Sequence, residues 1–265
     1  MNISVIQMNS TDSEDRNLEI CGNLITQAVS EGADLISLPE TFHWIGPEEE
    51  KPLHCSPVPG TVSEFLSSRA SQHGVYIHGG SILEKTKDPS VCANTTLFFS
   101  PDGTLQASYR KIHLFDAEIN GTQYRESDVV VPGREPASTT LNSLIYGFSI
   151  CYDLRFPELY RELSLQGADI IFCPAAFTQT TGQAHWETLV RARAIENQVF
   201  MIAAAQAGTD VTGKAYYGNS MIVDPWGTIL VRMDGKEEGC ATVEINPESI
   251  QEVRKNLPVL KHRKL

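Results

Sequence analysis

Hydrophobic residues along the chain follow two patterns, one typical of helices and one typical of buried strands. Between residues 16 and 31, apolar side chains recur every three or four positions, and the pattern stops at Gly32. This spacing predicts a helix whose apolar stripe consists of Leu18, Cys21, Leu24, Ile25 and Ala28. Short apolar runs that are bounded by turn residues predict strands that are buried on both faces.

Both patterns continue along the rest of the chain. Thr61-Val-Ser-Glu64 is typical of a capping box and predicts a helix that ends near Gly74. Further helices are predicted over 157–166 and 185–197, and a last one begins at Pro247. The predicted strands cover 35–38, 75–81, 95–100, 104–110, 148–151, 169–172, 199–205 and 241–245, with a hairpin over 221–232. Such alternation is typical of an α/β fold, and the hairpins predict mixed rather than purely parallel sheets.

Two stretches lack a regular pattern. The stretch 46–59 contains four prolines and an acidic patch, so we expect a surface loop there. The stretch 113–134 is predicted to be a long loop, and long loops in compact domains are often functional.

An internal repeat divides the chain into two similar halves. Gly32-Ala-Asp-Leu-Ile-Ser-Leu-Pro-Glu-Thr-Phe42 resembles Gly167-Ala-Asp-Ile-Ile-Phe-Cys-Pro-Ala-Ala-Phe177. Leu97-Phe-Phe-Ser-Pro-Asp-Gly-Thr-Leu105 resembles Met221-Ile-Val-Asp-Pro-Trp-Gly-Thr-Ile229 in the same order. Two ordered pairs indicate a duplication, and their period is too long for a solenoid. We therefore expect residues 1–265 to form a single domain with two similar halves, each a sheet flanked by helices.

Composition and charge exclude several classes of protein. The 265 residues carry a formal charge of −12, whereas nucleic-acid binding requires a basic face. No apolar run reaches the roughly 20 residues that span a bilayer, so we expect no membrane association. The beginning of the chain has no basic leader, and its six cysteines include no Cys-x-x-Cys pair. We therefore expect reduced thiols, a cytoplasmic protein and no metal site.

Cys151 is the strongest candidate for a nucleophile. It ends the apolar run of a predicted strand, and Pro157 follows where a helix can begin. A thiol at this position lies beside free backbone N–H groups, which can stabilise an oxyanion. The alternative is a buried core cysteine, which is the more common role of a single Cys.

Two more residues are found where predicted strands end. Glu40 follows the strand 35–38, and its counterpart in the repeat is Ala175, so a carboxylate interrupts a shared apolar pattern. This makes Glu40 a candidate general base, with an ordinary surface carboxylate as the alternative. Lys111 ends the strand 104–110 and could stabilise an oxyanion, although most lysines are simply solvated. Glu126 lies in the long loop and has no signal of its own.

Three motifs give the chain a family resemblance. Leu38-Pro-Glu-Thr-Phe42, Tyr109-Arg-Lys-Ile-His-Leu-Phe-Asp116 and Cys151-Tyr-Asp-Leu-Arg-Phe-Pro-Glu158 occur in the order typical of nitrilase-like carbon–nitrogen hydrolases. The resemblance implies an α-β-β-α sandwich with pseudo-twofold halves, whose subunits pair into a homodimer. It also implies Glu40 as general base, Lys111 as oxyanion stabiliser, Cys151 as nucleophile and Glu126 as a supporting glutamate. No cofactor is implied.

A finer resemblance implies the substrate class. Residues 185–198, 203–206 and 217–227 resemble the branch that hydrolyses deaminated glutathione to 2-oxoglutarate and cysteinylglycine, a metabolite-repair reaction. The alternatives are an omega-amidase that acts on 2-oxoglutaramate, a true nitrilase, and an inactive scaffold that works by binding partners.

Four residues are the candidates for substrate binding. The backbone N–H of Tyr152 is a second oxyanion donor, and Phe177 and Thr181 are expected to line the pocket. Arg155 is the candidate cation for the substrate carboxylate, because a guanidinium binds a carboxylate through two charge-assisted hydrogen bonds. The alternative for Arg155 is a structural ion pair with Asp153 or Glu158.

Overall fold

Two mixed sheets form the centre of the molecule in the computed structural model, which describes residues 1–119 and 121–264. The first sheet contains β1 (Asn2–Gln7), β2 (Leu35–Ser37), β3 (Tyr76–His78), β4 (Ile82–Lys85), β5 (Cys92–Phe99), β6 (Leu105–Arg110) and β17 (Gly239–Glu244). The second contains β9 (Ser138–Leu141), β10 (Leu144–Phe148), β11 (Ile170–Phe172), β12 (Phe200–Ala203), β15 (Met221–Val223) and β16 (Ile229–Arg232).

The two sheets have equivalent topologies. In the first, neighbouring strands run β17-β1-β2-β3-β5-β6, and only the pairs β1–β2 and β2–β3 are parallel. In the second, they run β9-β10-β11-β12-β15-β16, and only the pairs β10–β11 and β11–β12 are parallel. The repeated sequence segments fall on matching strands, β2 with β11 and β5 with β15. The predicted internal repeat is therefore present in the fold.

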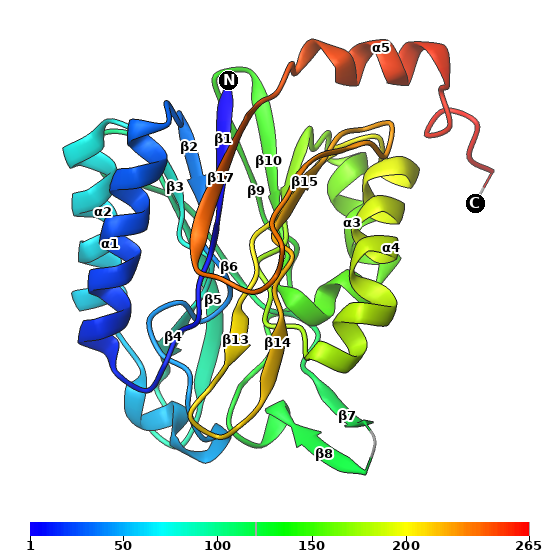
Figure 1. Ribbon diagram of the computed structural model, residues 1–265. Coiled ribbons are helices and arrows are strands. Elements are labelled where there is room, and N and C mark those ends of the chain that lie inside the picture. Colours follow the sequence, from blue (N-terminus) through cyan, green and yellow to red (C-terminus); the bar gives the residue numbers. More distant parts are fainter. Residues whose placement is uncertain (120, 265) are drawn as a thin grey trace.

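Helices cover the outer faces of both sheets (Figure 1). α1 (Glu14–Ser30) and α2 (Thr61–His73) lie on the side of the first sheet, and α3 (Pro157–Leu165) and α4 (Gln179–Asn197) on the side of the second. α5 (Glu248–Asn256) projects from the body near the C-terminus. This arrangement is an α-β-β-α sandwich, as the family resemblance implies, and its sheets are mixed, as the hairpins in the sequence predict. Within the described residues, no helix is both long and apolar enough to span a bilayer.

Aromatic side chains fill the space between the sheets. Phe98 of the first sheet contacts Tyr146, Phe148 and Phe172 of the second, with ring centroids 5.2–5.7 Å apart. His78 stacks on Phe172, with ring centroids 4.1 Å apart. Its Nδ1 is hydrogen-bonded to the hydroxyl of Ser37 at 2.9 Å and its Nε2 to the hydroxyl of Thr96 at 2.8 Å. Burial lowers the pKa of His78 to about 3, so the ring is neutral and acts as part of the core.

The structure corrects several predicted boundaries. The helix predicted from residue 185 begins at Gln179, because the Thr178 hydroxyl caps it by accepting the N–H of Thr181. Its first turn lies tightly on β14 (Ala215–Tyr217), where a Cβ at Gly182 would come within 2.2 Å of Tyr217. The helix α2 is where the sequence predicts it, but Gly60 rather than Thr61 is its cap.

The predicted long loop 113–134 contains regular structure. β7 (Asp116–Ile119) and β8 (Thr122–Arg125) form a small hairpin, and a 3₁₀ turn η2 (Glu126–Asp128) follows. Another short hairpin, β13 (Ala207–Thr209) with β14, lies nearby in Figure 1. The strand predicted to reach Cys151 ends at Phe148, and a 3₁₀ turn η3 (Cys151–Arg155) begins at the cysteine. The loop 46–59 holds a further 3₁₀ segment, η1 (Glu48–His54).

Candidate active site

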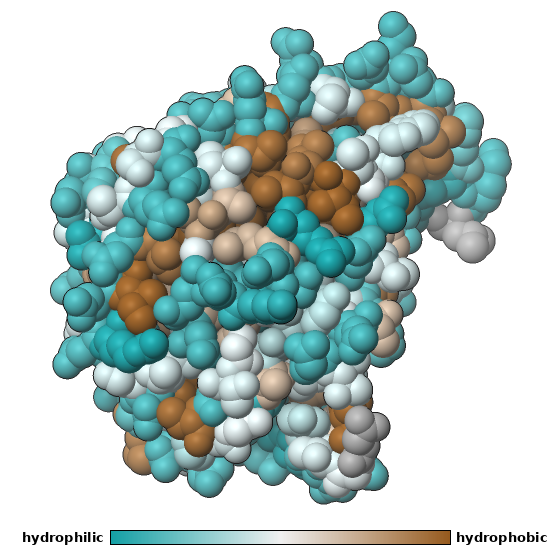
Figure 2. Space-filling view, viewed as in Figure 1, coloured by the Kyte–Doolittle hydropathy of each residue, from teal (hydrophilic) through white to brown (hydrophobic). Residues whose placement is uncertain are grey.

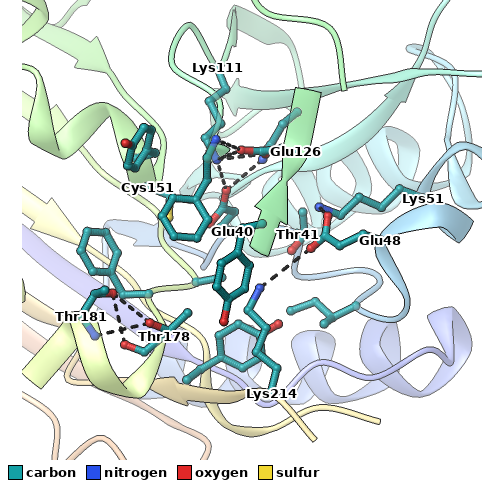
Figure 3. A pocket seen from close by; sticks show the side chains of 18 of the residues that line it. Glu40, Thr41, Glu48, Lys51, Lys111, Glu126, Cys151, Thr178, Thr181 and Lys214 are labelled. Atoms are coloured by element: carbon teal, nitrogen blue, oxygen red, sulfur yellow. Dashed lines mark hydrogen bonds and ion pairs between the residues drawn. The ribbon is translucent and has the colours of Figure 1, made fainter. Parts of the chain in front are cut away.

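One pocket brings together segments from both halves of the chain (Figure 3). Glu40 follows β2 of the first sheet, Lys111 follows β6, and Cys151 follows β10 of the second sheet. Glu126 reaches the same pocket from η2. About 770 Å³ of space lies between the lining residues, and this volume includes open solvent.

Lys111 lies at the centre of the charged groups, and its side chain is only 2% exposed. Its Nζ donates to Glu40 Oε1 at 3.0 Å and to both oxygens of Glu126 at 3.0 and 2.9 Å. Burial alone would lower the pKa of Lys111, but the carboxylates of Glu126 and Glu40 outweigh it and hold that pKa well above its usual range. Lys111 is therefore positively charged at any physiological pH.

Glu126 is the permanent counterion of Lys111. Burial would raise its pKa, but Lys111 and Lys51 outweigh burial and lower the pKa to about 2. The backbone N–H of Phe115 also donates to Oε2 at 2.6 Å, which fixes the carboxylate in place. Glu126 thus neutralises Lys111 without being free to accept a proton.

Glu40 faces Lys111 on one side and the Cys151 thiol on the other (Figure 3). Asn94 Nδ2 donates to Glu40 Oε1 at 2.9 Å, beside the bond from Lys111. Both of these bonds go to Oε1. Oε2 is therefore left to accept a proton. The backbone carbonyl of Glu40 accepts a bond from Gln206 Nε2 at 2.9 Å. These contacts fix both the carboxylate and the backbone.

The nucleophile candidate Cys151 occupies a strained position. Its φ of 47° lies in the left-handed region, which costs a residue with a side chain on the order of 1 kcal/mol or more. Its N–H donates to the carbonyl of Pro174 at 2.8 Å. Burial and the Glu40 carboxylate raise the pKa of the thiol well above its usual value, although Lys111 acts in the opposite direction. The resting side chain is therefore a neutral thiol rather than a thiolate.

Asp153 holds the turn that carries Cys151. Its carboxylate is fully buried and accepts the N–H of Ile150 at 2.9 Å, the hydroxyl of Tyr109 at 2.7 Å and the ring Nδ1 of His113 at 2.7 Å. Tyr109 and His113 lie on either side of Lys111 in the sequence. Asp153 therefore links the nucleophile's turn to the Lys111 segment.

The net charge of the side chains that line the pocket is opposite in sign to the net charge of the whole chain. The basic side chains that line it are Lys51, Lys111, Arg125, Arg155 and Lys214. The acidic ones are Glu40, Glu48 and Glu126. The pocket is thus net positive on a chain with a formal charge of −12, which favours an anionic ligand.

Comparison with known proteins establishes the family. The model of the family described as carbon-nitrogen hydrolase matches residues 2–255. The chain belongs to the carbon-nitrogen hydrolase family.

Individual relatives agree with this assignment. Deaminated glutathione amidase from Synechocystis is 41% identical over 264 residues, which cover 98% of this chain and 97% of that protein. Omega-amidase from Xenopus tropicalis is 36% identical, over 99% of this chain and 94% of that protein. The crystal structure of the C. elegans NitFhit protein superposes with a TM-score of 0.92 at 35% identity, over 99% of this chain and 65% of that one. Carbon–nitrogen hydrolase family membership and the amidase relatives identify the chain as an amidase.

All eight residues that the sequence singles out line this one pocket of the carbon-nitrogen hydrolase. They are Glu40, Lys111, Glu126, Cys151, Tyr152, Arg155, Phe177 and Thr181. Thr181 is buried and its hydroxyl bonds to that of Thr178 at 2.9 Å, so it has a structural contact as well. The individual roles of these residues stay predictions.

Arg155 does not form the structural ion pair that was the alternative for it. Among the described residues, it pairs with neither Asp153 nor Glu158. Its guanidinium instead lies over the rings of Phe177 at 5.2 Å and Tyr152 at 5.7 Å, and Nη1 is 3.2 Å from Nδ1 of His185. The arginine is thus held in the pocket wall by two aromatic rings and a histidine, and no carboxylate among the described residues is paired with it.

Sequence reasoning missed several residues of the site. Asn94 lies in β5 and donates to Glu40. A single amide side chain within a buried strand is unusual, and this is the sequence signal that could have indicated it. Glu48, Lys51 and Lys214 come from surface segments, and nothing in the sequence shows that they meet at the pocket. Among the described residues, no group of three or more His, Cys, Asp or Glu side chains is arranged to hold a metal ion.

Proposed function

We propose that this protein hydrolyses a short acidic amide, namely deaminated glutathione, to 2-oxoglutarate and cysteinylglycine. The observation that carries the proposal is the group Glu40, Lys111 and Cys151 in a net positive pocket. The Synechocystis relative at 41% identity bears the name of this activity. A reaction of this kind repairs a damaged metabolite.

The proposed first step begins from the neutral thiol. Glu40 Oε2 takes the thiol proton while Cys151 Sγ attacks the amide carbonyl, so that no free thiolate has to exist beforehand. The carbonyl oxygen becomes negative, and the charge of Lys111 and the backbone N–H of Tyr152 stabilise it. The N–H of Cys151 itself is bound to Pro174, so the next N–H along the chain is the candidate donor.

The remaining steps return the enzyme to its starting state. Glu40 gives its proton to the leaving nitrogen, the C–N bond breaks, and the acyl group stays on Cys151 as a thioester. Glu40 then takes a proton from water, whose oxygen attacks the thioester and releases 2-oxoglutarate. The proton returns to the sulfur. Glu126 keeps Lys111 charged throughout, because its own pKa lies far below neutral pH.

Omega-amidase activity on 2-oxoglutaramate is the second candidate. The Xenopus tropicalis relative of that name is 36% identical, and its substrate has the same 2-oxo acid end. An inactive binding scaffold is a weaker candidate, because Glu40, Lys111, Glu126 and Cys151 are all present and in contact. The amidase names of the relatives also favour amides over nitriles as substrates.

We expect the chain to form a homodimer. Apolar surface lies over β17 and extends toward α5, and no helix of the described residues covers this face (Figures 1 and 2). Leu230 and Val231 of β16 and Val243 of β17 are only partly buried.

Sedimentation velocity should give twice the mass of the chain, and Val243→Glu should shift the equilibrium toward monomer. A wild-type protein that sediments as a monomer would contradict this expectation.

Arg155→Ala should raise KM for acidic amides on the order of ten- to a hundredfold, because a charge-assisted bond to the substrate carboxylate is lost. Turnover of a neutral ester should stay close to the wild-type value. Steady-state kinetics on both substrates checks this, with Arg134→Ala, an exposed arginine outside the pocket, as the matched control. Equal losses on the acidic amide and the ester would argue for a structural role.

The rate of 2-oxoglutarate release tests the proposed function directly. Wild-type protein should release it faster from deaminated glutathione than from 2-oxoglutaramate, and Cys151→Ala should give the blank rate. Lys111→Met should reduce kcat by about 10²–10³, which is typical for the loss of an oxyanion donor. A preference for 2-oxoglutaramate would assign the omega-amidase reaction instead. Rates at the blank level for both substrates would support the scaffold.

A further inference from the structure

Lys214 is a pocket cation whose ion pair with a carboxylate is long. Among the described residues, the nearest carboxylate oxygen is Glu48 Oε1, which is 3.9 Å from Nζ and thus beyond hydrogen-bonding distance. Glu48 forms a closer ion pair with Lys51, and Lys51 and Lys214 together lower the pKa of Glu48 against the opposing effect of burial. Since Lys51 largely neutralises Glu48, the charge of Lys214 remains available to a ligand.

The fold holds the Lys214 ammonium at a defined place. The turn between β13 and β14 is fixed by Asp210, whose Oδ1 accepts the N–H of Thr212 at 2.8 Å and that of Lys214 at 3.0 Å. The hydroxyl of Tyr216 donates to Asp210 Oδ2 at 2.8 Å. The ammonium lies over the rings of Tyr216 at 5.3 Å and Tyr124 at 5.2 Å, and the side chain is 24% exposed. These contacts orient the side chain without using its N–H donors.

Lys214 lies at the boundary between the pocket and a surface groove. It lines the pocket that contains Cys151 and also an adjoining groove, which Tyr124 and Arg125 share with it. In Figure 3 it reaches the pocket from the side opposite Lys111. Arg155, in contrast, belongs to the same short turn as Cys151. Arg155 and Lys214 therefore reach the pocket from different elements, and a substrate that extends outward from Cys151 meets both.

We propose that Lys214 determines specificity by binding the terminal carboxylate of a peptide leaving group. The proposal rests on the proposed function: Arg155 binds the carboxylate of the 2-oxo acid, and Lys214 binds the glycine carboxylate of cysteinylglycine. An extended dipeptide spans roughly 7 Å, so this carboxylate lies well away from the scissile bond. 2-Oxoglutaramate releases ammonia and has no second carboxylate. Lys214 thus favours a dianionic peptide amide over the smaller amide.

The test compares three substrates in wild-type protein, Lys214→Met and Lys214→Arg. The substrates are deaminated glutathione, the same compound with its glycine carboxylate converted to an amide, and 2-oxoglutaramate. In Lys214→Met, kcat/KM for deaminated glutathione should fall on the order of ten- to a hundredfold, mainly through KM. The values for the other two substrates should change little, and Lys214→Arg should recover most of the loss. Lys87→Met, an exposed lysine outside the pocket, is the matched control for the change of charge.

The outcomes separate this inference from the function on which it rests. If wild-type protein hydrolyses deaminated glutathione and its amide derivative equally well, the inference fails while the proposed function stands. An equal loss on all three substrates in Lys214→Met would also overturn it, because the lysine would then only support the tyrosines and Glu48. If wild-type protein hydrolyses none of the three above the Cys151→Ala blank, the proposed function fails and the inference with it.

Discussion

The buried ion pair between Lys111 and Glu126 is the interaction on which the rest of the site depends. An ammonium that is 2% exposed is stable only with a counterion in contact, since an unpaired buried charge typically costs about 3–5 kcal/mol. Glu126 supplies that counterion in a position fixed by the backbone of Phe115. Because Lys111 is already neutralised, Glu40 does not need to serve as its counterion. Glu40 can therefore change protonation state during a reaction.

The same arrangement decides the state of the thiol. A Lys111 ammonium alone beside Cys151 would favour a thiolate. Glu40 opposes this effect. Its negative charge and its contact with the thiol raise the pKa of Cys151, while its Oε1 accepts a hydrogen bond from the Lys111 ammonium. A cysteine nucleophile can react as a preformed thiolate or lose its proton during the attack, and the raised pKa of the thiol favours the second route. The duplicated fold makes this contact possible, since Glu40 comes from one sheet and Cys151 from the other.

Sequence reasoning predicts the fold and much of the site for identifiable reasons. Glu40 stands out because it interrupts a pattern that the repeat otherwise shares, and Cys151 because a strand-to-turn junction precedes a helix. Glu126 gives no local signal, and only the family motifs point to it. The start of α4 depends on a threonine cap and on contact with Tyr217, which local periodicity does not encode. Lys214, Glu48 and Lys51 meet only through the packing of surface turns, so no single stretch of sequence reveals them.

The most direct test of Glu40 as the base that activates a neutral thiol is the ionisation of the Cys151 side chain. The ultraviolet absorbance of thiolate in wild-type protein minus that in Cys151→Ser isolates this one cysteine among the six. If Glu40 raises the pKa of the thiol, Cys151 should form no thiolate as the pH rises to its ordinary pKa of 9.0. In Glu40→Gln the thiolate should form at lower pH, because the Glu40 charge no longer opposes the effect of Lys111 on the sulfur. A thiolate already present at neutral pH in the wild-type protein would contradict the role of Glu40 as the base that activates a neutral thiol.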